Sequence, residues 1–206
     1  MFRERIFVIG GGPSLQNFDF NLLKDEKTMA VNYAVQHVPN PTYFVTADSG
    51  VIQRAVENNF WGLEETTKVV IMGREHPRYR NVKHFLKHYD VQLAPYRTDT
   101  GFLGFDYSHF VTGKNTGFCA FQYAVLLRFK EIYLLGFDMG RGENKRKYFY
   151  TEGRGTSSPF DMFLGHFIQG IKRLKSERRD QKVFLGSKPS KLEPYLEYVD
   201  VEGLLK

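Results

Sequence analysis

The chain contains very little cysteine and no long apolar run. Cys119 is its one cysteine in 206 residues, which excludes an intramolecular disulfide. Because Cys119 falls in an apolar pattern of helical spacing, we expect it to be a small core residue. No apolar run approaches the roughly 20 residues of a membrane-spanning helix. The N-terminal residues also lack the long apolar region of a signal peptide. We therefore expect a cytoplasmic protein without a transmembrane segment.

Several signatures of metal and nucleotide chemistry are also missing. The glycine-rich turn at Gly10–Gly12 is not followed by the Gly-Lys-Ser/Thr of a P-loop, and Leu15 stands where a dinucleotide fingerprint needs its third glycine. No Asp-x-Asp occurs, although metal-dependent sugar transferases usually carry two close aspartates. His84 and His88 lack the glutamate of a zinc-protease helix. We therefore expect that the protein needs no metal ion. A Mg²⁺-dependent transfer of diphosphate would be the exception.

The composition is that of one globular domain with a basic surface. Hydrophobic residues make up 42% and aromatic residues 16%, enough for a packed core. The net charge is +6, and much of the excess lies at 141–147 and 172–182. Basic surfaces attract phosphates and nucleic acid. Acidic residues interrupt the second run, which favours an ordinary solvated helix face there.

The most informative segment is Ile6–Leu15, with the sequence IFVIGGGPSL. An apolar run, three consecutive glycines, Pro13 and Ser14 predict a strand, a tight turn and a helix start. Backbone amides at a helix start suit an anion. Such turns also occur without ligands, so this segment alone leaves phosphate binding and a purely structural turn equally open.

Short apolar runs then repeat along the chain. Thr28–Asn32, Tyr43–Ala47 and Lys68–Met72 predict strands that are buried on both faces of a parallel sheet. Ligands of open α/β sheets bind at the carboxyl ends of the strands. Gly10–Gly12, Asn32 and Asp48 are therefore expected at one ligand-binding edge.

After residue 73, segments with a clear helix or strand pattern alternate with segments that have no regular pattern. We expect a helix near 81–89, a strand at 91–94, a helix from 115 with Thr116 as its N-cap, and an apolar strand that ends at Gly136 and Asp138. A last helix over 159–178 and a strand at 183–185 follow. The prediction is a single α/β, Rossmann-like domain over 1–206. Its mostly parallel sheet carries helices on both faces, with 74–112 and 139–158 as irregular insertion or lid-like segments.

In this order, the motifs resemble those of small bacterial sialyltransferases that use CMP-sialic acid on lipooligosaccharide. The shared features are GGGPSL, Asn32, the stretch NTGFCAFQYAVLLRFKEIYLLGFDMG from Asn115, and Leu164–His166. That family carries Gly-Asn-Gly-Pro-Ser-Leu, a Ser-Gly before a helix, a strand ending in Gly-Ile-Asp, and a Gly-His. The resemblance implies a glycosyltransferase that moves a sugar from a nucleotide-activated donor to a hydroxyl acceptor such as a glycan, and that needs no cofactor.

The resemblance also implies roles for individual residues. His166 takes the place of the general base, and a histidine pKa near 6.5 suits that task. One of two tyrosines, Tyr148 or Tyr150, would stabilise the leaving phosphate, and Gly140 stands where the family has another tyrosine. Independently of the resemblance, the positive charge of Lys147 would help to neutralise that phosphate. The expected donor-binding residues are Gly10, Gly11, Gly12, Ser14, Asn32, Asp48, Asn115, Thr116, Gly117 and Asp138. Gly11 and Tyr33 replace an asparagine and a glutamine of the family.

Alternatives to this function remain open, among them a Rossmann-like module without catalytic activity, because a fold does not dictate a function. The opening motif and the strand ending in Gly-x-Asp also resemble the archaeal-type 6-hydroxymethylpterin diphosphokinases, in which Asp48 and Asp138 would be the natural pair to hold Mg²⁺. A glycosyltransferase that acts on a modified nucleic-acid base would also account for the positive charge. The sequence is compatible with a homo-oligomer and contains no signature of a dedicated nucleic-acid-binding module.

Overall fold

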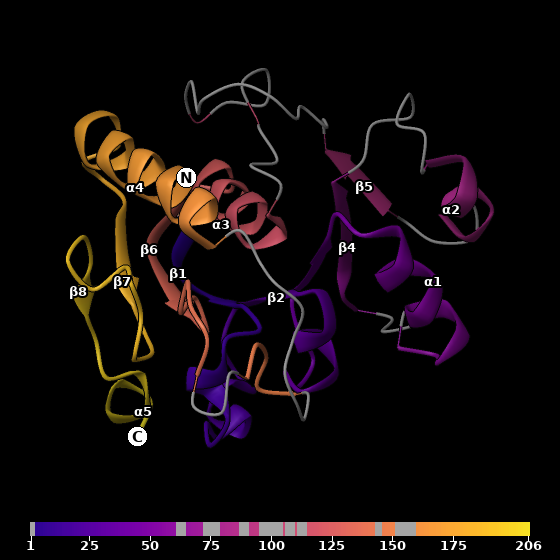
Figure 1. Cartoon of the computed structure of the whole chain (residues 1–206), viewed down its shortest axis with the longest axis horizontal. Helices are drawn as coiled ribbons and strands as arrows, with labels where there is room; N and C mark the ends of the chain where they lie inside the picture. The colour runs from indigo at the N-terminus through magenta and orange to yellow at the C-terminus, as the bar shows by residue number, and fades with distance from the viewer. Residues whose placement is uncertain are drawn as a thin grey trace.

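The computed structural model describes residues 3–60, 65–71, 79–86, 91–94, 105, 110, 115–142, 146–150 and 160–206. These residues form an eight-stranded sheet in the order β5-β4-β3-β2-β1-β6-β7-β8 (Figure 1). Every neighbouring pair in this sheet is parallel. The strands are β1 (Arg3–Ile9), β2 (Thr28–Val31), β3 (Tyr43–Thr46), β4 (Thr67–Ile71), β5 (Val91–Ala94), β6 (Phe129–Leu135), β7 (Lys182–Leu185) and β8 (Glu197–Tyr198).

Helices cover both faces of the sheet, which confirms the predicted Rossmann-like α/β architecture. The α-helices are α1 (Ser49–Glu57), α2 (Tyr79–Leu86), α3 (Thr116–Leu126), α4 (Phe160–Glu177) and α5 (Val201–Leu204). Three short 3-10 helices are η1 (Pro13–Leu15), η2 (Phe20–Leu23) and η3 (Asn32–Gln36). Helices α3 and α4 lie together over one face (Figure 1), and the other helices pack on the opposite face.

Alternation along the central strand explains the two cores. Ile6 and Val8 of β1 join the aromatic residues of α3 and α4, whereas Phe7 and Ile9 join the core on the opposite face. Successive side chains of a strand point to opposite faces, so a strand covered on both sides is apolar throughout. Cys119 is fully buried in α3, as expected, and burial raises the pKa of its thiol.

The strand order reverses beside β1. The chain builds β2 to β5 on one side of β1 and then returns to place β6, β7 and β8 on its other side. The carboxyl ends of β1 and β6 therefore lie next to each other at a topological switch point, where ligands of such sheets bind. Backbone hydrogen bonds continue past the strands there, from Gly10 N to Leu135 O (2.7 Å) and from Gly12 N to Gly136 O (2.9 Å).

The boundaries of several elements differ from the predictions. Thr116 was expected to be the N-cap of α3, but this is wrong. Asn115 is the N-cap because its side chain accepts a hydrogen bond from Phe118 N, and Thr116 is the first helical residue. The expected helix start at Pro13 is the short 3-10 helix η1, and a second 3-10 helix, η2, follows it. Helix α1 and the short elements β8 and α5 were not predicted.

The two segments expected to be irregular are described only in part. Within 74–112, α2 packs in a hydrophobic core and β5 forms one edge of the main sheet, so this stretch is not wholly an irregular insertion. The rest of it lies largely outside the described residues. Of 139–158, the structure describes 139–142 and 146–150. No helix among the described residues is long and apolar enough to cross a membrane.

Candidate functional site

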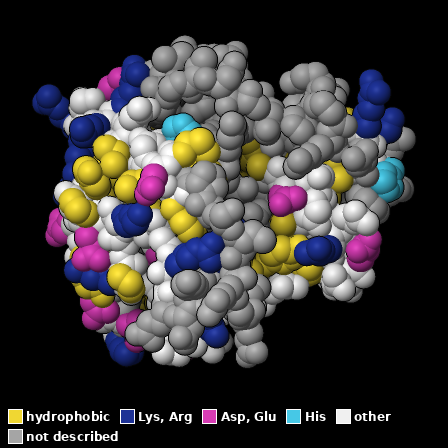
Figure 2. All heavy atoms as spheres, in the orientation of Figure 1, with side chains coloured by type: hydrophobic (Ala, Val, Ile, Leu, Met, Phe, Trp, Pro, Cys, Tyr) yellow, Lys and Arg dark blue, Asp and Glu magenta, His cyan; other side chains and the backbone are white. Residues whose placement is uncertain are grey.

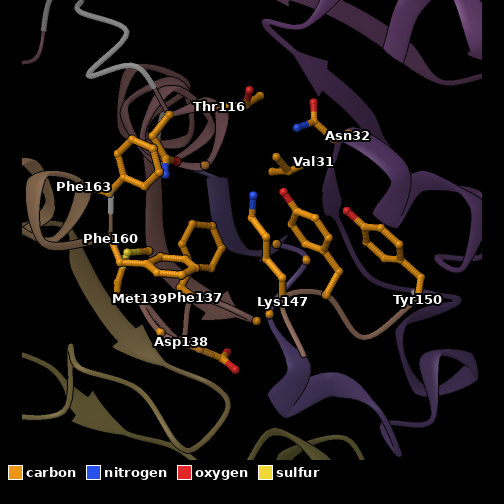
Figure 3. A pocket seen from close by; sticks show the side chains of 18 residues that line it. Val31, Asn32, Thr116, Phe137, Asp138, Met139, Lys147, Tyr150, Phe160 and Phe163 are labelled. Carbon is orange, nitrogen blue, oxygen red and sulfur yellow. The ribbon is translucent and has the colours of Figure 1, made fainter. Parts of the chain in front are cut away.

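A pocket of about 250 Å³ opens at the switch point between β1 and β6 (Figure 3). It brings together the turn after β1, the residue after β2, the start of α3, the segment after β6, two tyrosines and the first turn of α4. Its lining residues are Gly10, Gly11, Gly12, Val31, Asn32, Asn115, Thr116, Gly117, Gly136, Phe137, Asp138, Met139, Gly140, Lys147, Tyr148, Tyr150, Phe160 and Phe163. Most of the predicted donor-binding residues therefore meet in one place.

The glycine turn packs tightly against the end of β6. A Cβ on Gly10 would lie 2.6 Å from Gly136 O, and a Cβ on Gly12 would lie 2.6 Å from Asp138 Cγ. Gly136 itself has a φ of +70°, which few residues other than glycine adopt without strain. These glycines are required by the close crossing of two loops, independently of any ligand.

Ser14 and Asp138 join these two loops. Ser14 N donates to Asp138 Oδ2 (2.9 Å), and Ser14 Oγ donates to Asp138 Oδ1 (2.6 Å). Ser187 Oγ lies 3.0 Å from Ser14 Oγ and accepts a hydrogen bond from Gly136 N (2.7 Å). The anion at the start of η1 is thus a carboxylate of the chain itself. Burial raises the pKa of Asp138, and the hydrogen bonds from Ser14 oppose that rise.

Gly11 supports a different part of the site. Its carbonyl accepts a hydrogen bond from Phe149 N (3.0 Å), which docks residues 146–150 on the turn. A Cβ at this position would lie 2.9 Å from Tyr148 Cδ1 and 3.0 Å from the Tyr150 hydroxyl oxygen. The two tyrosine rings therefore occupy the space that a side chain on residue 11 would fill.

The N-terminus of α3 forms another side of the pocket. Asn115 caps the helix, with its Oδ1 accepting from Phe118 N (3.0 Å), and Thr116 and Gly117 begin the first turn. A Cβ on Gly117 would lie 2.9 Å from the ring of Phe137, so the glycine allows the helix start to approach the loop after β6. The partial positive charge of a helix N-terminus favours an anion in the pocket.

Asn32 and Lys147 supply hydrogen-bond donors to the pocket. Asn32 adopts a φ of +53°, a conformation that asparagine tolerates better than most residues. Thr46 Oγ1 accepts from Asp48 N (3.1 Å) and donates to Asn32 Oδ1 (2.9 Å), which leaves the amide nitrogen of Asn32 directed toward the pocket (Figure 3). The ammonium of Lys147 also points into the pocket and has no ion pair within the described residues.

Apolar side chains form the opposite side of the pocket. Phe137 and Met139 come from the segment after β6, and Phe160 and Phe163 come from the first turn of α4 (Figure 3). The site thus combines one cationic side with one aromatic side, a combination that suits a ligand with both anionic and apolar parts. Sequence reasoning did not assign these four residues to the site, because an aromatic residue that lines a pocket has the same pattern as one in the core.

Asp48 and His166 are not among the residues that line this pocket. Asp48 is the N-cap of α1, and its carboxylate accepts from Gly50 N (2.8 Å). His166 is half-buried on α4, where its ring stacks on Phe118 with 5.8 Å between centroids. Phe163, which does line the pocket, precedes His166 by about one helical turn.

The two carboxylates that the diphosphokinase alternative assigns to Mg²⁺ each accept hydrogen bonds from the chain. Both oxygens of Asp138 accept hydrogen bonds from Ser14, and Asp48 is used as a helix cap. No group of three or more His, Cys, Asp or Glu side chains that could hold a metal occurs in the described part of the chain.

Charge on the visible surface is mixed. On the face shown in Figure 2, Lys and Arg side chains are interspersed with Asp and Glu. Within 172–182, Arg173 forms an ion pair with Glu177 (2.6 Å), and Lys175 donates to the carbonyl of Tyr195 (2.7 Å). This part of the basic run is a solvated helix face, as the interrupting acidic residues indicated.

Comparison with known proteins gives matches at the level of structure. No protein-family model and no curated protein sequence matches the chain. The sialyltransferase CstII from Campylobacter jejuni, solved with cytidine-5'-monophosphate, matches with a TM-score of 0.58 at 17% identity, over 98% of this chain and 87% of that chain. The same enzyme with CMP-3FNeuAc gives a TM-score of 0.58 at 18% identity, over 95% of this chain and 86% of that one.

An alpha-2,3-sialyltransferase from Campylobacter jejuni in apo form gives a TM-score of 0.59 at 17% identity, over 96% of this chain and 80% of that one. None of these three structures is a pterin diphosphokinase, so the second resemblance lacks support from them. The chain shares the fold of these sialyltransferases over nearly its whole length.

Proposed function

We propose that the chain is a glycosyltransferase that transfers a sugar from a nucleotide-activated donor, CMP-sialic acid or another nucleotide sugar, to a hydroxyl acceptor. One observation supports this proposal most directly. The ammonium of Lys147 and the N-terminus of α3 share one pocket at the switch point of the sheet. Two sources of positive potential in one pocket suit a phosphate group.

The phosphate of the donor would lie between Lys147 and the first turn of α3. When the bond from the sugar to the phosphate breaks, negative charge develops on the departing phosphate. The ammonium of Lys147, the amides of the first turn and a tyrosine hydroxyl would stabilise that charge. The amide nitrogen of Asn32 is a further donor, available to the ribose or the base. Because these groups can neutralise the leaving phosphate, the proposed reaction requires no metal ion.

His166 is proposed as the general base that takes the proton of the acceptor hydroxyl. It lies one helical turn beyond Phe163 and stacks on Phe118 of α3, so it is close to the pocket without lining it. In this proposal the acceptor binds beyond the apolar side, between the pocket and His166. A His166→Ala variant should retain nucleotide binding and lose most of the transfer rate. An unchanged transfer rate would remove His166 from the mechanism.

The first experiment measures nucleotide release from a panel of CMP-, UDP- and GDP-sugars, with glycan and nucleic-acid acceptors and with and without Mg²⁺. We expect release from one donor class in the presence of EDTA. Binding of ATP that depends on Mg²⁺, with no release from any nucleotide sugar, would contradict the glycosyltransferase and favour a diphosphokinase. Binding of neither donor class would indicate a protein without this activity.

A further inference from the structure

Residues 37, 148 and 150 form a continuous stack of rings that ends at Lys147. The ring of His37 stacks on Tyr150 at 5.9 Å and 15°, and Tyr150 stacks on Tyr148 at 5.2 Å and 6°. Lys147 Nζ lies 5.0 Å from the centroid of the Tyr148 ring. We call Tyr148, Tyr150 and His37 the aromatic stack. An ammonium at this distance from a ring face is attracted to its π-electrons.

The stack is anchored on the side away from the pocket. Phe149 lies between the two tyrosines in the sequence, and its ring packs against His37 and Phe20. The distances between ring centroids are 5.0 Å and 5.3 Å. Tyr33 meets Tyr150 at 6.0 Å, and Arg54 Nη1 donates to the Tyr33 hydroxyl (3.0 Å). These contacts hold the stack on η2, η3 and α1, which pack in the hydrophobic core on one face of the sheet.

Space for the stack exists only because residue 11 has no side chain. A Cβ at Gly11 would come within 3.0 Å of both tyrosines, including a ring carbon of Tyr148 that cannot move without moving its ring. The backbone of Gly11 meanwhile holds the same segment through the bond from Phe149 N. Gly11 therefore accepts a hydrogen bond from Phe149 and, because it has no side chain, leaves room for the rings of Tyr148 and Tyr150.

We propose that Gly11 and the aromatic stack are positioning residues for the ammonium of Lys147, holding it in the pocket where an anionic group of the ligand binds. The proposal rests on the proposed function for the identity of that ligand, a nucleotide phosphate. A lysine side chain without such contacts samples many rotamers. If a ring face already confines the side chain in the free protein, less conformational entropy is lost when a ligand binds.

The test compares Gly11→Ala with Gly165→Ala. A Cβ on Gly165 meets no atom within 4 Å, so this helix variant controls for the glycine-to-alanine change itself. The probe is cytidine 5'-monophosphate, with its dissociation constant measured by titration calorimetry. We expect Gly11→Ala to weaken binding about tenfold and Gly165→Ala to leave it unchanged. In a Lys147→Met background, Gly11→Ala should have no further effect, because the two changes act through one group.

A spectroscopic signal tests the stack without any ligand. Lysines carrying ¹³C-methyl groups keep their charge, and the methyl resonance that disappears in Lys147→Arg identifies Lys147. We expect an upfield ring-current shift in the wild type and in Gly165→Ala, and its loss in Gly11→Ala and Tyr148→Leu.

The outcomes separate the two proposals. If the wild type does not bind the nucleotide, the proposed function and the positioning role toward it both fail, and the resonance alone reports whether the stack holds Lys147. If the wild type binds but Gly11→Ala binds equally well, or keeps the shifted resonance, the positioning proposal is wrong while the proposed function stands.

Discussion

The smallest unit that organises this site is the contact between Ser14 and Asp138, two residues separated by 124 positions in the sequence. It joins the turn after β1 to the segment after β6, and the glycines of both loops allow the two backbones to meet. A buried carboxylate is stable only when it is hydrogen-bonded, and Ser14 supplies both donors. Asp138 and the glycines of both loops also line the pocket, so the residues that join the loops form part of its wall.

Gly12→Ala should destabilise the fold strongly. The added Cβ would meet the carboxylate of Asp138 and the carbonyl of Gly136, neither of which can move without breaking the contact between the loops. We expect a loss of about 3 kcal/mol in the free energy of unfolding, measured by urea denaturation. Gly165→Ala, which meets nothing within 4 Å, is the control and should be neutral or slightly stabilising. Equal stability of the two variants would contradict this account of the turn.

Asp138 should also give the stability of the protein a specific pH dependence. Burial raises its pKa above the ordinary 3.8, so the folded state binds the proton more tightly than the unfolded state does. Stability contributed by this proton is present below the ordinary pKa and is lost as the pH rises toward the folded value. The free energy of unfolding of the wild type minus that of Asp138→Asn should therefore fall across that interval. A difference that rises with pH there would show that the hydrogen bonds from Ser14 outweigh burial.

Helix α3 contributes both to the hydrophobic core and to the pocket. Its aromatic and small side chains fill the core against α4 and the sheet, while its N-terminus faces the pocket. The helix starts at Thr116 because Asn115 offers an acceptor to Phe118 N, and Gly117 permits the close approach of Phe137. The contact with the core fixes where the positive end of the helix points.

Asn115→Asp should affect nucleotide binding without lowering the stability of the fold. An aspartate keeps the cap and adds a negative charge at the helix start, so stability should be unchanged or rise by about 0.5 kcal/mol. The same charge would repel a phosphate in the pocket, and we expect at least about tenfold weaker binding of cytidine 5'-monophosphate. Asp19→Asn, a change at the N-cap of η2 outside the pocket, should leave binding unaffected. Unaltered binding in Asn115→Asp would place the anion away from α3.

Over the whole molecule, the position of the site follows from the order of the strands. Strands β1 and β6 lie near the centre of the sheet, and their carboxyl-terminal halves, 6–9 and 132–135, are buried, whereas β8 at one edge is short and exposed. The most stable part of the fold therefore lies directly under the pocket, and the loops that line it extend from these central strands. Such a site can hold its groups in place before a ligand arrives.

Native-state hydrogen exchange should show that local stability decreases from the central strands to the edge strand. Amides of β1 and β6 should exchange only with global unfolding, and those of β8 should exchange faster through local opening. Addition of cytidine 5'-monophosphate should increase protection at 10–14 and 115–118 more than at β8. Protection of β8 equal to that of β1 would contradict the assigned edge, and protection that rises uniformly would indicate no specific binding at the switch point.

The apolar patterns along the chain were enough to predict the fold class and the general place of the site. Buried parallel strands are continuous apolar runs, and their ends are marked by Gly10–Gly12, Asn32 and Gly136, so local patterns predicted the strands and the edge where they meet. The contacts of each residue at that edge could not be predicted from these local patterns. Asp138 bonds to Ser14, Asp48 caps α1, and Gly11 makes room for two tyrosines, because these contacts join segments far apart in the chain or depend on exact spacing in three dimensions.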